Sequence, residues 1–141
     1  MLGQGIEKLN LKKYILENKL SKNVIIGKYL NNPFPLIKKS DLFVLTSIYE
    51  GLPNVLLEAI ALNKIVISTN CPTGPKEILL NGKGGILFKV GDYVELAHKI
   101  INFSKNKKNY KKKIFIAKKS LSKFNYNFNL NEYLKLYKSL H

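Results

Sequence analysis

Two glutamates eight positions apart, Glu50 and Glu58, are the residues of this chain best suited to bind or act on a polar ligand. Glu50 opens the sequence EGLPN, whereas Glu58 lies within the apolar run from Val55 to Leu62. A carboxylate in such a run is costly unless a partner satisfies it. For Glu58 the sequence leaves three environments open: an internal salt bridge, a solvated helix edge, or the hydroxyl groups of a ligand.

The loop that contains Glu50 has the composition of an anion-binding site. We predict a strand that ends at Thr46 and a helix over residues 53–63, because Pro53 suits the first helical position. Gly51 lets the backbone approach a ligand closely, and the first amides of a helix lack an internal acceptor. Ligands of open α/β sheets bind beyond the carboxyl ends of the strands, where this loop falls. Glu50 and Glu58 are therefore predicted to open into one cleft there.

Short apolar runs alternate with helical patterns along the rest of the chain. Their unbroken character indicates strands that are buried on both faces, in a parallel sheet with helices on each side. The predicted strands are residues 23–27, 41–46, 64–69 and 85–89. This alternation predicts an α/β fold with a Rossmann-like open parallel sheet, helices on both faces and a C-terminal helical tail.

Helix signals place the other elements of the sheet region. One helical face near the N-terminus comprises Ile6, Leu9, Leu16 and Leu20. Pro75 suits the start of a further helix. Asp92, with Glu95 three residues later, forms a capping-box pattern that predicts a helix to about Phe103.

The last third of the chain carries two more helical faces. The first comprises Tyr110, Ile114, Ala117, Leu121 and Phe124, spaced by three and four. The second comprises Leu130, Tyr133, Leu134, Tyr137 and Leu140. We expect both apolar stripes to pack on the sheet while lysines cover the solvent side. Residues 105–141 are thus interpreted as lysine-rich helices of a single domain that spans residues 1–141.

Composition excludes several classes of protein. With 141 residues, 45% of them hydrophobic and 23% charged, the chain has the profile of one globular domain and not of a disordered protein. No apolar run approaches the ~20 residues of a membrane span, and the start lacks a signal-peptide pattern. A single cysteine, Cys71, excludes an internal disulfide framework and a cysteine-rich metal site. We therefore predict a cytoplasmic domain.

The positive charge is concentrated in the C-terminal third. All 24 basic residues are lysines, and residues 99–141 hold twelve of them against one acid, Glu132, which gives +11 of the net +15. One interpretation is a basic α/β module that binds nucleic acid or an anionic surface without catalysis. Specific contacts to phosphate and guanine favour arginine, which is absent, so nucleic acid is the weaker partner. Attraction to anionic lipid at the inner membrane face stays open.

The order of these motifs resembles a known family. Residues 40–92, from SDLFVLTS through EGLPN and PTGPKEIL to NGKGGILFKVGD, are similar to the C-terminal, donor-binding half of retaining glycosyltransferases of family 4, which have the two-Rossmann type B fold. Glu50 and Glu58 match the two acids of that family's Glu-x7-Glu motif. MLGQGIEKL resembles its glycine-bearing strand end and following helix, and FNYNFNLNEYLKLYKSL its terminal helix. The similarity covers nearly the whole chain.

The resemblance implies a role for each matching residue. Glu50, the implied catalytic residue, would face the donor sugar and stabilise positive charge at its anomeric carbon, and Glu58 would hold the ribose hydroxyls. The other implied donor-binding residues are the segment Gly51, Leu52, Pro53, Asn54 and Val55, which contributes backbone amides, Gly27, Lys28 and Tyr29 at the base pocket, Gly3 and Gly5 beside the phosphates, and Thr73 and Gly74 at the cleft edge. A tight turn is the alternative role for Gly3 and Gly5.

The resemblance also implies the substrate and what lies outside this chain. The donor would be a nucleotide diphosphate sugar, expected to be a UDP-sugar, with no cofactor. The only aspartates, Asp41 and Asp92, cannot form the Asp-x-Asp motif that holds a metal in other sugar transferases, so no metal is implied. Complete family members are longer, with an acceptor-binding domain and a strand and loop whose Arg and Lys contact the diphosphate. We therefore expect the chain alone to be inactive; a degenerate fragment that binds weakly is a further interpretation.

Overall fold

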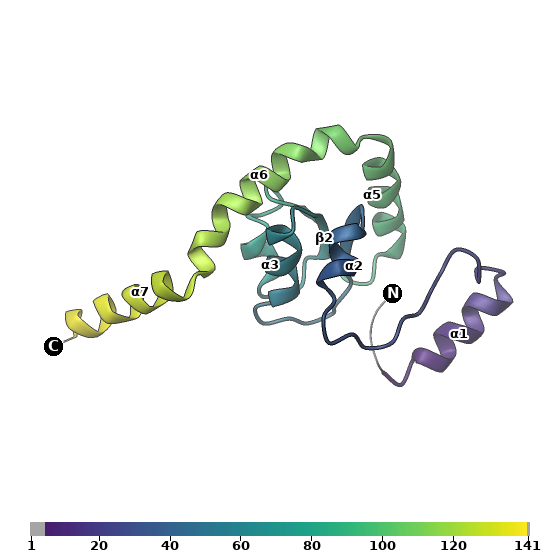
Figure 1. Cartoon of the computed structure of the whole chain (residues 1–141), viewed down its shortest axis with the longest axis horizontal. Coiled ribbons are helices and arrows are strands. Elements are labelled where there is room, and N and C mark those ends of the chain that lie inside the picture. The colour runs from purple at the N-terminus through teal and green to yellow at the C-terminus, as the bar shows by residue number, and fades with distance from the viewer. Residues whose placement is uncertain (1–4, 141) are drawn as a thin grey trace. The chain divides into compact units, whose positions relative to one another are not determined.

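The computed structural model describes residues 5–140, and the chain divides into two compact units, Met1–Pro33 and Phe34–His141. Figure 1 shows the helices and strands that make up each unit. Within residues 5–33 the first unit contains one helix, whereas the second unit is built around a parallel sheet.

The helix of the first unit, α1 (Lys8–Glu17), confirms the helix predicted near the N-terminus. It ends in a turn at Lys19, whose φ is 56° and whose N–H donates to the carbonyl oxygen of Leu16 at 3.1 Å. No residue of α1 is buried, and Leu9 and Leu16 of its apolar face are exposed.

The strand predicted at residues 23–27 is wrong. Residues 24–30 belong to neither a helix nor a strand. A strand needs a neighbour whose N–H and C=O groups pair with its own, and the described residues of this unit contain no second strand. Val24 and Ile26 are accordingly only half-buried, and Ile25 is exposed.

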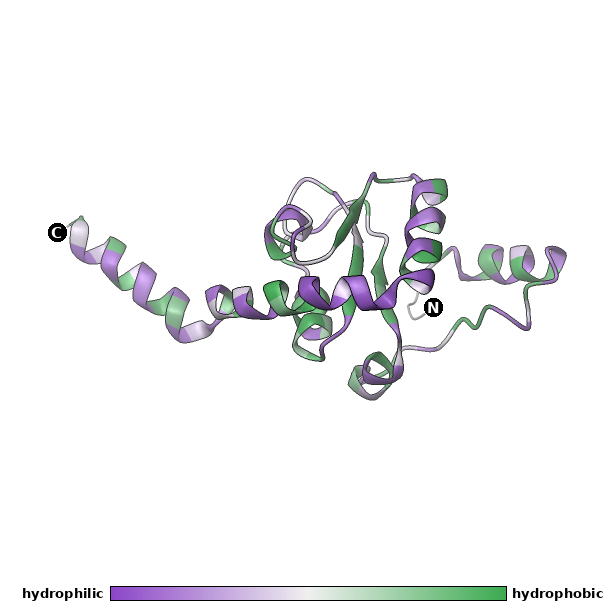
Figure 2. Ribbon diagram, turned by 90° about the horizontal axis from the view of Figure 1, so that it is seen from above, coloured by the Kyte–Doolittle hydropathy of each residue, from purple (hydrophilic) through white to green (hydrophobic). Residues whose placement is uncertain are grey.

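The sheet of the second unit is parallel, with the strand order β1–β2–β3. The strands β1 (Leu42–Leu45), β2 (Ile65–Thr69) and β3 (Ile86–Phe88) all lie within predicted strands. The register pairs Val44 with Ile67 and Ile67 with Ile86. β2 is central, and each of its residues is buried, as an unbroken apolar run predicts. Figure 2 shows the hydrophobic colouring of the strands.

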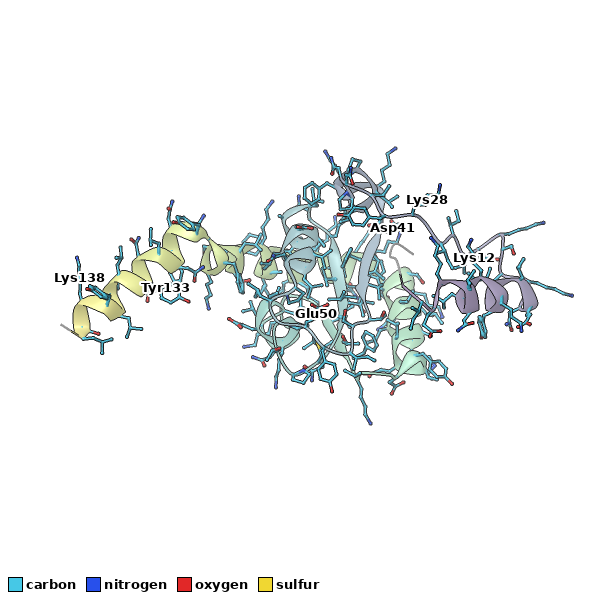
Figure 3. All side chains as sticks on the ribbon, turned by 90° about the horizontal axis from the view of Figure 1, so that it is seen from below. Lys12, Lys28, Asp41, Glu50, Tyr133 and Lys138 are labelled. Carbon is cyan, nitrogen blue, oxygen red and sulfur yellow. The ribbon has the colours of Figure 1, made fainter. Side chains whose placement is uncertain are left out.

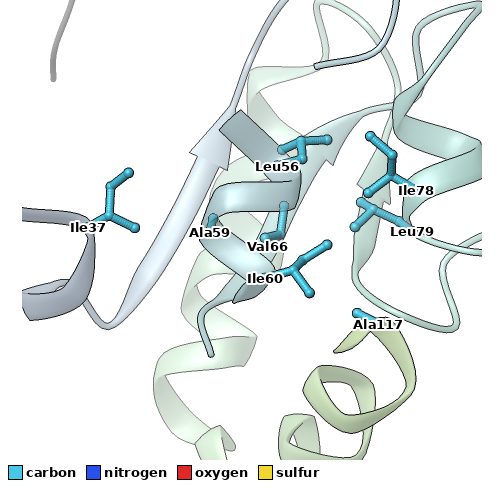
Figure 4. Packing of buried hydrophobic residues seen from close by; sticks show 8 residues of the cluster. All are labelled: Ile37, Leu56, Ala59, Ile60, Val66, Ile78, Leu79 and Ala117. Atoms are coloured by element: carbon cyan, nitrogen blue, oxygen red, sulfur yellow. The ribbon is translucent and has the colours of Figure 1, made fainter. Parts of the chain in front are cut away.

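Helices cover this sheet and enclose its core. α3 (Asn54–Ala61) and α6 (Lys111–Ser120) pack against β2, α5 (Tyr93–Lys105) packs against β3, and β2 lies between α3 and α5 in Figure 1. The other helices are α2 (Phe34–Lys39), α4 (Pro75–Ile78), α7 (Tyr126–Ser139), η1 (Lys107–Tyr110) and η2 (Leu121–Phe124). Figure 4 shows the core cluster: Ile37, Leu56, Ala59, Ile60, Val66, Ile78, Leu79 and Ala117. The predicted α/β fold is confirmed.

The two apolar stripes of the C-terminal third behave differently. The stripe around Ala117 packs as predicted, because Ala117 is buried and the other four positions are half-buried. The expected packing of the last stripe on the sheet is wrong. α7 begins after Asn125, whose extended backbone (φ −76°, ψ 139°) ends the preceding helical direction, and no residue of α7 is buried. Figure 3 shows Tyr133 and Lys138 projecting from opposite sides of α7.

None of the helices in the described part of the chain is long and apolar enough to cross a membrane.

The start of α5 is fixed by Asp92, the predicted N-cap, whereas Glu95 accepts its hydrogen bond from Lys89 and not from the Asp92 N–H that a complete capping box would use. Asp92 Oδ1 accepts a hydrogen bond from the Glu95 N–H at 2.8 Å, and Glu95 Oε2 accepts one from the Lys89 N–H at 2.8 Å. The bond from Lys89, followed by the hydrogen bond from Lys99, holds the pKa of the Glu95 carboxyl below its usual value.

Replacing the cap should weaken the fold. Asp92→Ala should lower the free energy of unfolding by about 1 kcal/mol, because the Glu95 amide loses its side-chain acceptor. Asp92→Ser is the matched control, since its hydroxyl can accept the same bond. Urea unfolding followed by circular dichroism measures both variants. Equal midpoints for Asp92→Ala and the parent chain would contradict this role of Asp92.

Candidate functional site

Glu50 lies on the loop that joins β1 to α3, beyond the carboxyl end of β1, as predicted (Figure 3). Glu50 itself is half-buried. In the segment that follows, Gly51, Leu52 and Asn54 are exposed, Val55 is half-buried and Pro53 is buried. The N-cap residue of α3 is Pro53, which makes no side-chain capping bond. No capping side chain therefore competes with a ligand for the first amides of α3.

The loop after β2 holds the Glu50 loop through two threonine side chains. Thr69 Oγ1 donates a hydrogen bond to the carbonyl oxygen of Ser47 at 2.6 Å. Thr73 Oγ1 donates one to the carbonyl oxygen of Glu50 itself. Because β1 and β2 are parallel neighbours, their carboxyl ends meet at one edge, which brings the two loops together. Thr73, predicted at a cleft edge, thus fixes the backbone of Glu50.

Gly74 lets the same two loops come into contact. Its φ is +84°, a conformation that residues with side chains rarely adopt. A Cβ atom at this position would lie 2.0 Å from the carbonyl oxygen of Gly51 and 2.5 Å from Cδ of Pro53. Only glycine fits, so Gly74 sets the separation of the loops. We call the contacts of Thr69, Thr73 and Gly74 with residues 47–53 the loop clamp.

Glu58 borders an open groove next to α3. The groove has a volume of about 490 Å³ and is lined by Leu57, Glu58, Ala61, Leu121, Ser122, Phe124 and Asn125. Glu58 is half-buried and forms no ion pair with any described residue, so the internal salt bridge considered for it is wrong. Its carboxylate is open to solvent or to a ligand. Glu50 does not line this groove, and the shared cleft stays a prediction.

Five predicted donor-binding residues belong to the first unit. Gly3 lies outside the described residues. Gly5 is exposed, Gly27 is half-buried, and Lys28 and Tyr29 are exposed in the segment that follows α1. Their contacts with the base and the phosphates of a nucleotide stay predictions.

The cysteine, one aspartate and one histidine of the described chain lie outside the Glu50 loop. Cys71 is buried, and its Sγ lies 3.8 Å from the carbonyl oxygen of Thr73. Asp41 is exposed and accepts a hydrogen bond from Lys107 Nζ at 2.8 Å, which lowers the pKa of its carboxyl. His98 is exposed on α5. Among residues 5–140, no group of three or more His, Cys, Asp or Glu side chains could hold a metal ion.

The chain has the sequence pattern of a known protein family. Residues 1–120 match the model of the family described as glycosyl transferases group 1. The chain belongs to this family. The resemblance found in the sequence is thereby confirmed, and the three-stranded sheet with its helices matches the Rossmann-like C-terminal domain of a type B glycosyltransferase fold.

Individual glycosyltransferases resemble the chain over only part of their own length. An uncharacterized glycosyltransferase of Methanocaldococcus jannaschii is 47% identical over 79 residues, which are 56% of this chain and 20% of that protein. A Staphylococcus aureus TarM variant, solved with UDP, fondaparinux and alpha-GlcNAc-glycerol, matches 96% of this chain and 28% of its own with 25% identity and a TM-score of 0.85. The structure of a glycosyltransferase of Rickettsia africae matches 99% of this chain and 38% of its own chain, with 26% identity and a TM-score of 0.84. The chain therefore spans well under half the length of these glycosyltransferases.

Substitution of Gly74 tests the loop clamp. In Gly74→Ala the new methyl group would meet the Gly51 carbonyl and the Pro53 ring, so either the loops separate or the core adjusts. Gly82→Ala is the matched control, because Gly82 has a φ of +86° but no atom within 4 Å of an added Cβ. We expect Gly74→Ala to lose about 2 kcal/mol more unfolding free energy than Gly82→Ala. Equal losses in urea unfolding would show that the Gly74 contact does not hold the loops together.

Proposed function

We propose that this chain is the donor-binding domain of a retaining glycosyltransferase, which moves a sugar from a nucleotide diphosphate sugar to a hydroxyl acceptor. The loop clamp carries the proposal, because it holds Glu50 at the carboxyl edge of the sheet in a chain of this family. The proposed donor is a UDP-sugar. The UDP in the TarM structure supports this choice of nucleotide.

The proposed role of Glu50 is electrostatic. When the bond between the anomeric carbon and the diphosphate breaks, positive charge develops at that carbon, and a fixed carboxylate beside it stabilises the transition state. The hydrogen bond from Thr73 to the Glu50 carbonyl holds the backbone of that residue. Little reorganisation is then needed when the charge develops.

The amides at the start of α3 are proposed to receive the negative charge of the donor. The positive end of the α3 dipole and the uncapped amides of Asn54 and Val55 would meet the sugar and the distal phosphate. This arrangement needs no metal ion, so EDTA should leave nucleotide binding unchanged. Glu58 would accept hydrogen bonds from the ribose hydroxyls, which are strengthened by its charge.

Transfer also needs a surface that orients the acceptor and excludes water from the cleft. Next to Glu50, the large apolar residues Ile48, Tyr49 and Leu52 are exposed. We propose that an acceptor-binding domain covers this apolar rim in the active enzyme. The 141-residue chain should accordingly bind donor nucleotide without measurable sugar transfer.

Calorimetric titration with UDP, GDP, ADP and UDP-sugars separates the proposed roles of the two glutamates. Glu58→Gln should weaken UDP binding at least about tenfold, because a charge-assisted hydrogen bond to the ribose is lost. Glu50→Gln should leave UDP binding unchanged and weaken only the binding of UDP-sugars. Glu132→Gln on α7, which removes an exposed carboxylate paired with Lys135, is the control and should change neither.

Four results would count against this proposal. Weaker UDP binding in Glu50→Gln, or unchanged UDP binding in Glu58→Gln, would contradict the roles of the glutamates. Sugar transfer by the chain alone would contradict the proposed need for an acceptor-binding domain. A chain that binds none of the nucleotides would favour the alternative of a basic binding module without catalysis.

A further inference from the structure

The outer face of α6 carries a cluster of lysines with an aromatic ring in its middle. Residues three and four apart share one face of a helix. Lys111 lies four residues before Phe115, and Lys118 and Lys119 lie three and four residues after it. We call this surface the α6 basic face; it comprises Lys111, Lys112, Phe115, Lys118 and Lys119. It unites positive charge with an apolar ring on a single side of the helix.

The exposure of Phe115 is imposed by the packing of α6. Ala117 and Ser120 on the opposite side of the helix are buried, and α6 packs against α3 and β2. Because that side is held in the core, the helix cannot rotate to bury the ring. Phe115 is 61% exposed. A large apolar side chain is thus held in solvent on a rigid support.

The lysines of this face have no acidic partners. In the described part of the chain, the ion pairs of the C-terminal third are Lys99–Glu95, Lys107–Asp41 and Lys135–Glu132. Lys118 donates to the neutral amide oxygen of Asn63 at 2.9 Å. The positive charge on this face is therefore uncompensated and attracts anions.

Lys113 does not belong to the α6 basic face, although it lies in the same lysine run. Its Nζ donates to the carbonyl oxygen of Gly82, and burial, with a smaller effect of Lys99, lowers the pKa of its ammonium. Lys113 is therefore half-buried, whereas the four lysines of the α6 basic face are exposed.

We propose that the α6 basic face docks the protein on an anionic phospholipid bilayer. The ammonium groups would contact the lipid phosphates while the Phe115 ring enters the boundary between headgroups and acyl chains. Lys119 Nζ lies 4.6 Å from the centroid of this ring, so charge and apolar surface are presented together. This interaction is independent of the donor site and of the function proposed for it.

A bilayer fits this face better than a nucleic acid does. Nucleic-acid recognition favours arginine, which is absent, and single strands bind in grooves where bases stack on open aromatic faces. The α6 basic face is the convex side of a helix, and Lys119 lies over one face of its only ring. A convex surface with lysines around one apolar side chain matches a broad anionic surface.

A tryptophan reporter can test the insertion of residue 115, because the chain contains no tryptophan. Phe115→Trp in the full chain should give a blue-shifted emission on mixing with vesicles of phosphatidylglycerol and phosphatidylcholine, and none with phosphatidylcholine alone. Tyr93→Trp is the matched control, because Tyr93 is 80% exposed on α5. Its emission should not shift. A shift at position 93 without one at position 115 would overturn the proposal.

Vesicle flotation measures the contribution of each part of the face. Phe115→Ala should weaken partitioning about fivefold, through loss of buried apolar area. Lys112→Gln with Lys119→Gln should weaken it about twenty-fivefold, since each lysine close to an anionic surface contributes about a fivefold gain. Lys38→Gln with Lys39→Gln removes the same charge from exposed positions of α2 and should have a much smaller effect. Added salt should weaken binding steeply.

Several outcomes would contradict docking through α6. Equal losses in the two double lysine variants would show attraction to net charge alone. An unchanged Phe115→Ala together with a weakened Tyr133→Ala would place the contact on α7. Tight binding of RNA by a chain that does not float with vesicles would identify a nucleic acid as the partner.

Discussion

The contact of Gly74 with the carbonyl group of Gly51 is the constraint on which the candidate site depends. Parallel neighbouring strands bring their carboxyl-end loops to one edge of a sheet, but they do not fix one loop against the other. Here the missing side chain of Gly74 allows backbone-to-backbone contact, and Thr73 then reaches the carbonyl oxygen of Glu50. A larger residue at position 74 would meet the Gly51 carbonyl and the Pro53 ring, so this approach of the two loops needs glycine there.

Another contact of the loop clamp, the hydrogen bond from Thr69, links the site to the stability of the core. Thr69 is the last residue of β2 and is buried, so its hydroxyl needs an acceptor inside the protein. The carbonyl oxygen of Ser47, in the Glu50 loop, is that acceptor. One hydrogen bond therefore satisfies a core polar group and positions the functional loop. The loop is fixed by the interior of the protein, and the rim residues Ile48 and Tyr49 are free to face a partner surface.

Local signals in the sequence were sufficient to predict the three strands of the sheet, the N-cap of α5 and the position of the Glu50 loop. Elements whose structure depends on distant partners were not predictable in this way. Residues 23–27 have a strand pattern but no strand to pair with in their unit, and the stripe of α7 does not pack on the sheet. The role of Thr69 was also missed, because threonine is an ordinary strand residue and Ser47 lies 22 positions away. The exposure of Phe115 was also not predicted. Its neighbours Ile114 and Ile116 are equally apolar but half-buried, and only the rotation of α6 about its axis, which packing fixes, turns Phe115 to solvent.

In the proposed function, the loop clamp presents Glu50 and the amides that follow it to the sugar of the donor. The most direct test is a comparison of amide chemical shifts in the isotope-labelled chain with saturating UDP and with saturating UDP-sugar. The UDP-sugar should shift the amides of Glu50, Gly51 and Asn54 more than UDP does. If the UDP-sugar shifts other amides but leaves residues 50–55 as they are with UDP, the sugar is bound elsewhere and the loop clamp does not present Glu50 to it.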